Sequence, residues 1–263
     1  MAGIVYLVGA GPGAPDLITI RGAEVLARAD IVFYDALVHP ETVALAGCAR
    51  KVPVGKRCGG IVTDQRFINR SLVEASLQYR IVVRLKGGDP MLFGRVQEEI
   101  TALEQHGVPY EIVPGVTAAL AASAELGIPL TQRGLSRSVT FATPRMGVGQ
   151  KPTGWVRGIS ATDTLALYMS LGNAAELSAT LQARGMSAAT PAAIVANTSL
   201  PTRRHIRTTL AELAQARDWE VEGPAILLVG AAFREKTDAK NAGAKGDAFC
   251  KDGFEDSLSV RLA

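Results

Sequence analysis

Three turns rich in glycine carry the residues best suited to binding a small ligand. They span residues 9–16 (Gly-Ala-Gly-Pro-Gly-Ala-Pro-Asp), 86–90 (Lys-Gly-Gly-Asp-Pro) and 113–119 (Val-Pro-Gly-Val-Thr-Ala-Ala). Each turn follows a short aliphatic run that is typical of a strand. Glycine at the carboxyl end of a strand lets the backbone approach a ligand closely, and open α/β sheets bind ligands at those ends. The three turns together therefore predict a ligand site, although each alone is weak evidence.

The first turn also fits a permissive form of the dinucleotide-binding fingerprint through three small residues, Gly9, Gly11 and Ala14. A nicotinamide-dependent oxidoreductase is thus one candidate. Pro12 and Pro15 count against it, because proline has no backbone N–H to donate to a pyrophosphate. The apolar period of the next helix also begins only near Gly22, outside the turn. A tight turn without a ligand stays open for this segment.

The elements that position these turns are short β-branched runs alternating with segments of helical period, which predicts an α/β fold with a largely parallel sheet. The strands are expected at 4–8, 31–34, 51–54, 81–85, 110–113, 138–142, 164–169, 192–196, 203–207 and 225–229. The helices are expected at 22–28, 65–78, 96–105, 116–126, 174–184 and 210–216. Because the alternation restarts after residue 130, we expect domains at 1–130 and 131–233. Residues 234–263 lack an apolar period and are expected to be a poorly ordered tail.

Composition excludes several classes of protein. The 263 residues include 28 Lys and Arg against 25 Asp and Glu, and this net charge of +3 gives no reason to expect a nucleic-acid partner. Polar residues interrupt the most apolar stretch, 116–130, so no membrane span is expected. The N-terminus lacks the pattern of a signal peptide. The three cysteines form no C-x-x-C pair, and reduced thiols favour a cytoplasmic protein. The cysteines and histidines show no metal-ligand spacing, so no metal site is expected.

A set of ordered motifs resembles the tetrapyrrole methylases. The motifs lie at 8–13 (Val-Gly-Ala-Gly-Pro-Gly), 34–38 (Tyr-Asp-Ala-Leu-Val), 54–57 (Val-Gly-Lys-Arg), 84–90 (Arg-Leu-Lys-Gly-Gly-Asp-Pro), 93–95 (Phe-Gly-Arg), 113–119 and 127–131 (Gly-Ile-Pro-Leu-Thr). The resemblance runs from residue 4 to 233 and is strongest to the members that act on uroporphyrinogen III. It implies two α/β domains, each a sheet flanked by helices, with the active-site cleft between them, and a homodimer.

The resemblance also implies a cofactor, S-adenosyl-L-methionine, which leaves as S-adenosyl-L-homocysteine. The family's cofactor contacts match ten positions: Pro12, Gly87, Gly88, Asp89, Leu92, Thr117, Ala118, Met169, Thr198 and Ala225. Thr198 matches less closely, because a smaller residue is common there. Thr117 is also a plausible helix N-cap.

The activity implied is transfer of methyl groups to two pyrrole carbons of uroporphyrinogen III, giving precorrin-2 for siroheme, cobalamin or haem d1. Asp35 matches a proposed proton acceptor, and a carboxylate at a strand end suits that role. Lys56 matches a proposed proton donor. Arg95 and Arg133, with Glu98 one helical turn beyond Arg95, match substrate-binding positions, and arginine suits a substrate with eight carboxylates. Arg95 is also a candidate for assisting proton movement.

Other interpretations remain open at this point. Asp35 could have a purely structural role, in hydrogen bonding to nearby backbone. For the protein as a whole, the alternatives are another corrin-ring methyltransferase, a methylase of ribosomal RNA, and a binding protein that retains the cleft without catalysis. The chain also departs from close relatives at Gln132 and at Thr143-Pro144-Arg145. These departures concern the placement of the substrate more than the cofactor site.

Overall fold

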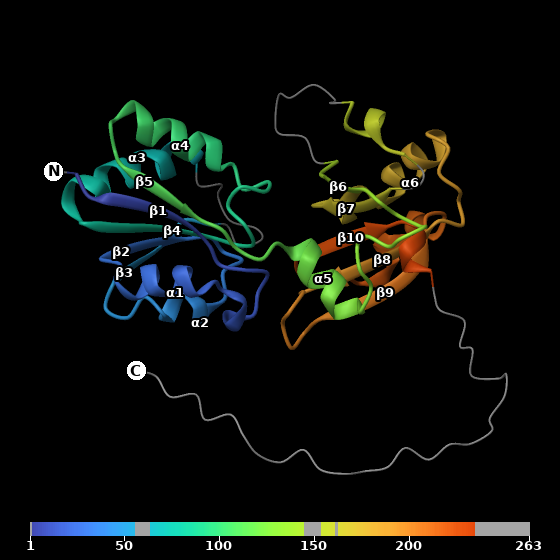
Figure 1. The fold of residues 1–263 in the computed structure, drawn as a ribbon, viewed down its shortest axis with the longest axis horizontal. Coiled ribbons are helices and arrows are strands. Elements are labelled where there is room, and N and C mark those ends of the chain that lie inside the picture. Colours follow the sequence, from blue (N-terminus) through green and yellow to red (C-terminus); the bar gives the residue numbers. More distant parts are fainter. Residues whose placement is uncertain (1, 56–63, 145–153, 161–162, 235–263) are drawn as a thin grey trace, which may run out of the picture.

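The computed structural model describes residues 2–55, 64–144, 154–160 and 163–234. Within them the chain forms two five-stranded sheets with helices on both faces (Figure 1). This arrangement is the α/β architecture, with sheets flanked by helices, that the sequence predicted.

The first sheet is entirely parallel, with strand order β3-β2-β4-β1-β5. Its strands are β1 (Ile4–Gly9), β2 (Ile31–Tyr34), β3 (Arg50–Pro53), β4 (Ile81–Lys86) and β5 (Tyr110–Val113). One face is covered by α1 (Ile20–Ala27) and α2 (Pro40–Ala44), the other by α3 (Gln65–Gln78) and α4 (Val96–Gln105) (Figure 1). Because the strands are parallel, their carboxyl ends and the turns that follow lie along one edge.

The second sheet has strand order β6-β7-β10-β8-β9. Its strands are β6 (Val139–Ala142), β7 (Thr164–Tyr168), β8 (Pro191–Ala196), β9 (Arg204–Thr209) and β10 (Ala225–Val229). Only β6 and β7 pair in parallel, while β10 runs antiparallel to both of its neighbours and β8 runs antiparallel to β9. The expectation of a largely parallel sheet was therefore wrong for this half. The last strand returns between β7 and β8, and the runs of apolar residues do not encode that direction.

The helices of the second half include α6 (Ala174–Ala183) and α5 (Ala118–Leu126) on opposite faces of the sheet. The segment expected as an α-helix at 210–216 forms a 3₁₀ helix at 212–219 instead. Further short 3₁₀ helices lie at 15–17, 155–158, 171–173 and 231–233. Among the described residues no helix combines the length and apolar character that crossing a bilayer requires.

Helix α5 links the halves. Ala119 and Ala122 are fully buried in one apolar cluster with residues of β7, β8 and β10, so α5 packs on the second sheet (Figure 1). It nevertheless precedes residue 130, where the sequence places the domain boundary, and that boundary stays a prediction. The tail at 235–263 lies outside the described residues.

Candidate functional site

The first two glycine turns are joined directly by backbone hydrogen bonds. The N–H of Gly88 donates to the carbonyl of Gly11 at 2.7 Å, and the N–H of Gly11 donates to the carbonyl of Gly88 at 3.2 Å. Both residues have positive φ, +81° at Gly11 and +69° at Gly88, a conformation that glycine adopts without strain. The two turns therefore form one unit at the carboxyl ends of β1 and β4.

The third turn packs against this unit so closely that a side chain would not fit. A Cβ atom on Gly115 would lie 2.3 Å from the carbonyl oxygen of Gly88 and 2.8 Å from the Cα of Gly9. The carboxylate of Asp89 accepts a hydrogen bond from the N–H of Gly115 at 2.9 Å. Asp89 thus ties the second turn to the third, and the three turns converge as expected.

Tyr168 brings the second half to the same place. Its hydroxyl lies 2.6 Å from Oγ1 of Thr117 and accepts a hydrogen bond from the N–H of Ala119 at 3.2 Å. Its ring lies 5.0 Å from the ring of Phe93, which follows the second turn. The next residue, Met169, is 47% exposed and has a φ of +52°. An apolar side chain is therefore exposed to solvent at the end of a strand.

The expectation that Thr117 caps α5 is confirmed for its position and corrected for its chemistry. Thr117 is the N-cap residue, but its side chain makes no capping hydrogen bond. Its hydroxyl is hydrogen-bonded to that of Tyr168, which also accepts the N–H of Ala119 in the first turn of the helix. Burial raises the pKa of the Tyr168 hydroxyl, although its hydrogen bonds with Thr117 and Ala119 act in the opposite direction.

A second contact between the halves involves Thr198, which is 5% exposed. A Cβ atom on Gly13 would lie 2.8 Å from the carbonyl oxygen of Thr198, and the neighbouring Ser199 hydroxyl accepts a hydrogen bond from the N–H of Ala14 at 2.8 Å. Ala225 begins β10 beside this turn, since it pairs with Ala196 in β8.

The remaining cofactor candidates flank the same turns. Pro12, Leu92 and Ala118 are half-buried, and Gly87 is exposed. All ten candidates thus lie on or next to turns that contact one another, and they come from both halves of the chain.

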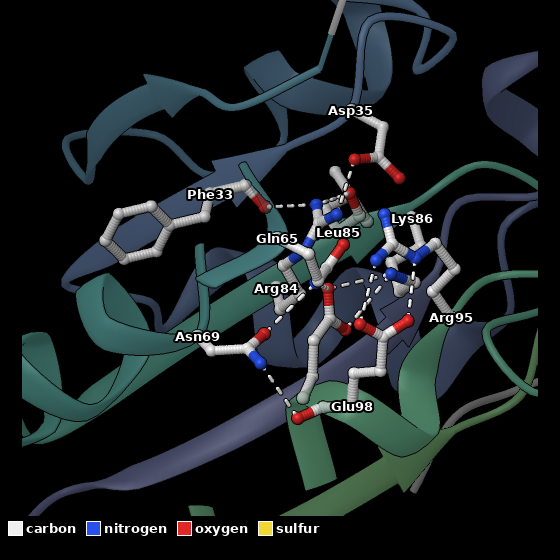
Figure 2. Close-up of polar contacts among 10 residues, drawn as sticks. Phe33, Asp35, Gln65, Asn69, Arg84, Leu85, Lys86, Arg95 and Glu98 are labelled. Atoms are coloured by element: carbon white, nitrogen blue, oxygen red, sulfur yellow. Dashed lines mark hydrogen bonds and ion pairs between the residues drawn. The ribbon is translucent and has the colours of Figure 1, made fainter. Parts of the chain in front are cut away.

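A buried network of charged groups lies beside the glycine turns (Figure 2). The guanidinium of Arg84 donates to Asp35 at 2.5 Å and to Glu99 at 3.0 Å, and the ammonium of Lys86 contacts both oxygens of Glu99 at 2.9 and 3.0 Å. Gln65 donates to Glu99 at 3.2 Å. Two cations and two anions therefore neutralise one another, which is what charged groups removed from water require.

The network alters the proton affinity of its cations. Burial opposes the charge of Arg84, but the attraction and hydrogen bonds of Asp35 and Glu99 outweigh burial and raise the pKa of Arg84. For Lys86 the balance is reversed: burial and repulsion by Arg84 exceed the attraction of Glu99 and Asp35, so its pKa is lowered.

The substrate candidates occupy more exposed positions. Arg95 forms a bidentate pair with Glu98 at 2.7 and 2.8 Å, and this hydrogen bonding raises the pKa of Arg95 (Figure 2). Arg133 is exposed in a turn closed by hydrogen bonds between Gln132 and Ser136. Lys56 lies outside the described residues, and so does Arg145, where the chain differs from close relatives.

Sequence reasoning missed the contacts of Arg84, Lys86, Glu99 and Tyr168, although it placed Lys86 in the second glycine turn. A signal for the first three was present. Arg84 and Lys86 are two residues apart in an otherwise apolar strand, so they point to the same face of the sheet. Glu99 lies on the helix face of Val96, Ile100 and Leu103, all of which are buried. Charges at core positions of two packed elements indicate an ion pair.

The comparisons with known proteins bear on this site. The sequence matches the family model described as Tetrapyrrole (Corrin/Porphyrin) Methylases over residues 4–214. The chain belongs to the tetrapyrrole methylase family. The resemblance stated from the motifs is thereby confirmed.

Among its relatives, this methylase is 44% identical to the uroporphyrinogen-III C-methyltransferase of Pseudomonas aeruginosa, covering 89% of this chain and 96% of that protein. It is also 44% identical to siroheme synthase 2 of Halorhodospira halophila, over 87% of this chain but 47% of the relative, so it spans about half of that protein.

The fold is shared with a solved structure, the uroporphyrin-III C-methyl transferase of Thermus thermophilus complexed with S-adenyl homocysteine. The TM-score is 0.77 at 38% identity, covering 88% of this chain and 94% of the other. The two-sheet architecture of this methylase is therefore that of an enzyme crystallised with the product form of the methyl donor.

Proposed function

We propose that this methylase transfers methyl groups from S-adenosyl-L-methionine to two pyrrole carbons of uroporphyrinogen III, which gives precorrin-2. One observation carries the proposal: the glycine turns of the first half converge with Tyr168 and Met169 of the second half on one site. The likeness to enzymes named for this reaction, over almost the whole length of one of them, supports the choice of substrate.

The described residues fit the methyl donor. Where the turns meet, a Cβ atom on Gly9 would lie 2.7 Å from backbone atoms of Gly88 and Gly115, so the backbone itself forms the wall. The peptide groups of the exposed Gly87 and the half-buried Gly88 suit the polar groups of a nucleoside and an amino acid, while the exposed Met169 offers an apolar contact. S-adenosyl-L-methionine supplies a methyl group on a positively charged sulfur, which is an electrophile that needs no further activation.

The protein's part in the reaction is alignment and proton removal. Holding the ring carbon in line with the methyl group is proximity catalysis, and the converging turns provide the fixed frame for it. Alkylation of a pyrrole carbon must be followed by loss of a proton. We assign the role of proton acceptor to the Asp35 carboxylate, which is 31% exposed. Lys56 is the proposed proton donor.

Substrate recognition is assigned to Arg95, with Glu98 and Arg133. The planar guanidinium of Arg95 is held by Glu98 and remains 58% exposed, so it retains N–H groups for a substrate carboxylate. We place Arg95 at the substrate side of the site, where it also assists proton movement.

The direct test is incubation of purified protein with freshly generated uroporphyrinogen III and labelled S-adenosyl-L-methionine, followed by the mass of the product. Gain of two methyl groups supports the proposal. Binding of S-adenosyl-L-homocysteine without transfer contradicts it and favours a binding protein, and transfer only to a later corrin ring contradicts the choice of substrate.

The assembly and the pathway are further proposals. The family resemblance supports a homodimer and a role in siroheme, cobalamin or haem d1 synthesis, and the cysteine pattern supports a place in the cytoplasm. Light scattering on the full chain measures the assembly, and a monomeric mass at working concentration contradicts the dimer.

A further inference from the structure

Arg84 is held more tightly than charge neutralisation alone requires. Its side chain is 2% exposed, and its Nη2 donates to Oδ1 of Asp35 while its Nε donates to Oε1 of Glu99. Its Nη1 donates to the carbonyl of Leu85 at 3.2 Å and lies 3.5 Å from that of Phe33. Every nitrogen of the guanidinium therefore has a fixed acceptor, and the group has one orientation (Figure 2).

Asp35, in contrast, lies in the turn that follows β2, and its side chain is 31% exposed. Only Oδ1 faces Arg84, and in Figure 2 the other carboxylate oxygen points away from the guanidinium. Among the residues that the structure describes, none donates a hydrogen bond to Oδ2 of Asp35. Arg84 thus fixes one oxygen of the carboxylate.

We propose that Arg84 is a positioning residue, which fixes the carboxylate of Asp35 in one orientation while Glu99 fixes Arg84. This inference rests on the proposed function, because it gives Asp35 the role of proton acceptor. Arg84 lies in a buried strand and Glu99 in the packed helix α4, so both belong to rigid elements, whereas Asp35 does not. The rigid sheet thereby sets the geometry of a group on a turn.

The fork of arginine is essential to this arrangement. Lysine has the same charge but a single nitrogen, so it cannot hold Asp35 and Glu99 at the distances of 2.5 and 3.0 Å that the two ends of the guanidinium span. Lys86 already occupies the other side of Glu99. Replacing Arg84 by lysine therefore keeps the charge of the network and removes the fixed orientation.

The test compares Arg84→Lys with Arg21→Lys, a matched change at an exposed arginine 3.9 Å from Glu111. For each variant we measure thermal stability, the dissociation constant of S-adenosyl-L-homocysteine, and kcat and KM for uroporphyrinogen III. Arg84→Lys is expected to lower kcat about 100-fold, as for a misplaced reacting group, with KM and the dissociation constant within about twofold. Arg21→Lys is expected to match the wild type.

A double-mutant cycle with Asp35→Ala separates positioning from general disturbance. If Arg84 acts through Asp35, Arg84→Lys has no further effect on kcat in the Asp35→Ala background. Additive losses, or a kcat of Arg84→Lys near that of the wild type, overturn the inference. If Arg84→Lys does not fold, Arg84→Gln with Glu99→Gln removes one cation and one anion together and takes its place.

Crystal structures distinguish failure of this inference from failure of the proposed function. A wild-type protein that transfers no methyl group contradicts the proposed function only. The Asp35 carboxylate bound to Arg84 in the wild type and turned away in the variant then supports positioning. The same carboxylate position in both structures overturns it.

Discussion

Replacing Glu99 by glutamine tests whether the buried network stabilises the first half as the contacts indicate. The Glu99 side chain is 0% exposed and is the shared acceptor for Arg84, Lys86 and Gln65. Glutamine has nearly the same shape but no charge. Its amide NH2 also replaces an acceptor oxygen and faces the N–H donors of Arg84, Lys86 and Gln65. The variant leaves two buried cations with Asp35 as the single counter-charge.

The expected loss in the free energy of unfolding is about 3 kcal/mol, at the lower end of the range for breaking a buried ion pair. The loss stays at this end because Lys86 can release its proton, since its pKa is already lowered by burial and by Arg84. Stabilities of whole domains are only about 5–15 kcal/mol, so such a loss is readily measured.

Urea unfolding followed by circular dichroism at pH 7, without ligand, provides the assay. Glu98→Gln is the matched control, because Glu98 is 50% exposed and pairs with the exposed Arg95. It is expected to lose less than about 1 kcal/mol. Equal losses in the two variants would refute the buried network as a source of stability.

The deficit of Glu99→Gln also depends on pH. The unfolded state holds the proton of Lys86 up to its ordinary pKa of 10.5, whereas the folded state releases it at lower pH. The unfolded state therefore binds more protons in this window, and stability rises with pH there. Because Glu99 raises the pKa of Lys86, Glu99→Gln lowers that pKa further, so the rise is larger in the variant than in the wild type. The difference in the free energy of unfolding between variant and wild type should shrink as the pH rises toward the ordinary lysine pKa of 10.5. A difference that does not change with pH contradicts the assignment to Lys86.

Further changes address the converging turns. Gly115→Ala places a methyl group against the Gly88 carbonyl and should weaken binding of S-adenosyl-L-homocysteine by about tenfold or more in calorimetry, while Gly158→Ala, where nothing lies within 4 Å, should not. Tyr168→Phe should weaken the same binding, and the absorbance difference between wild type and variant should show a phenol titrating above pH 10. Because the folded state holds that proton more tightly, the wild type should lose stability relative to the variant as the pH rises past 10. Asp35→Ala should lower kcat by about 100-fold or more with little change in cofactor affinity, and wild-type turnover would remove Asp35 from the mechanism.

Much of the fold could be predicted because its elements are patterned locally. The expected ends of β2, β5, α3 and α4 agree with the structure to the residue, since short runs of β-branched and aromatic residues mark the strands and helical period marks the helices. The short helix α2 was missed, because five residues contain too little of a period. The direction of β10 was not predictable, since it depends on pairing between segments far apart in the chain.

The site likewise has features that the sequence predicts and features that it does not. The glycine turns could be expected to converge, because parallel strands bring their carboxyl ends to one edge. The partners of Asp35 and Thr117 could not be read from those turns. Arg84 lies 49 residues from Asp35, and Tyr168 lies 51 residues from Thr117, on the other sheet. Such contacts are set by packing of whole elements, and only the charges buried in β4 and α4 gave a hint of them.

The central claim is that turns from both halves of the chain bind one methyl donor. A crystal structure of the full chain with S-adenosyl-L-homocysteine measures this directly. The account predicts the nucleoside and the amino-acid part in contact with the backbone at Gly88 and Thr117 and with Met169, and the sulfur facing Asp35. A ligand bound elsewhere, or held by one half alone, would contradict it.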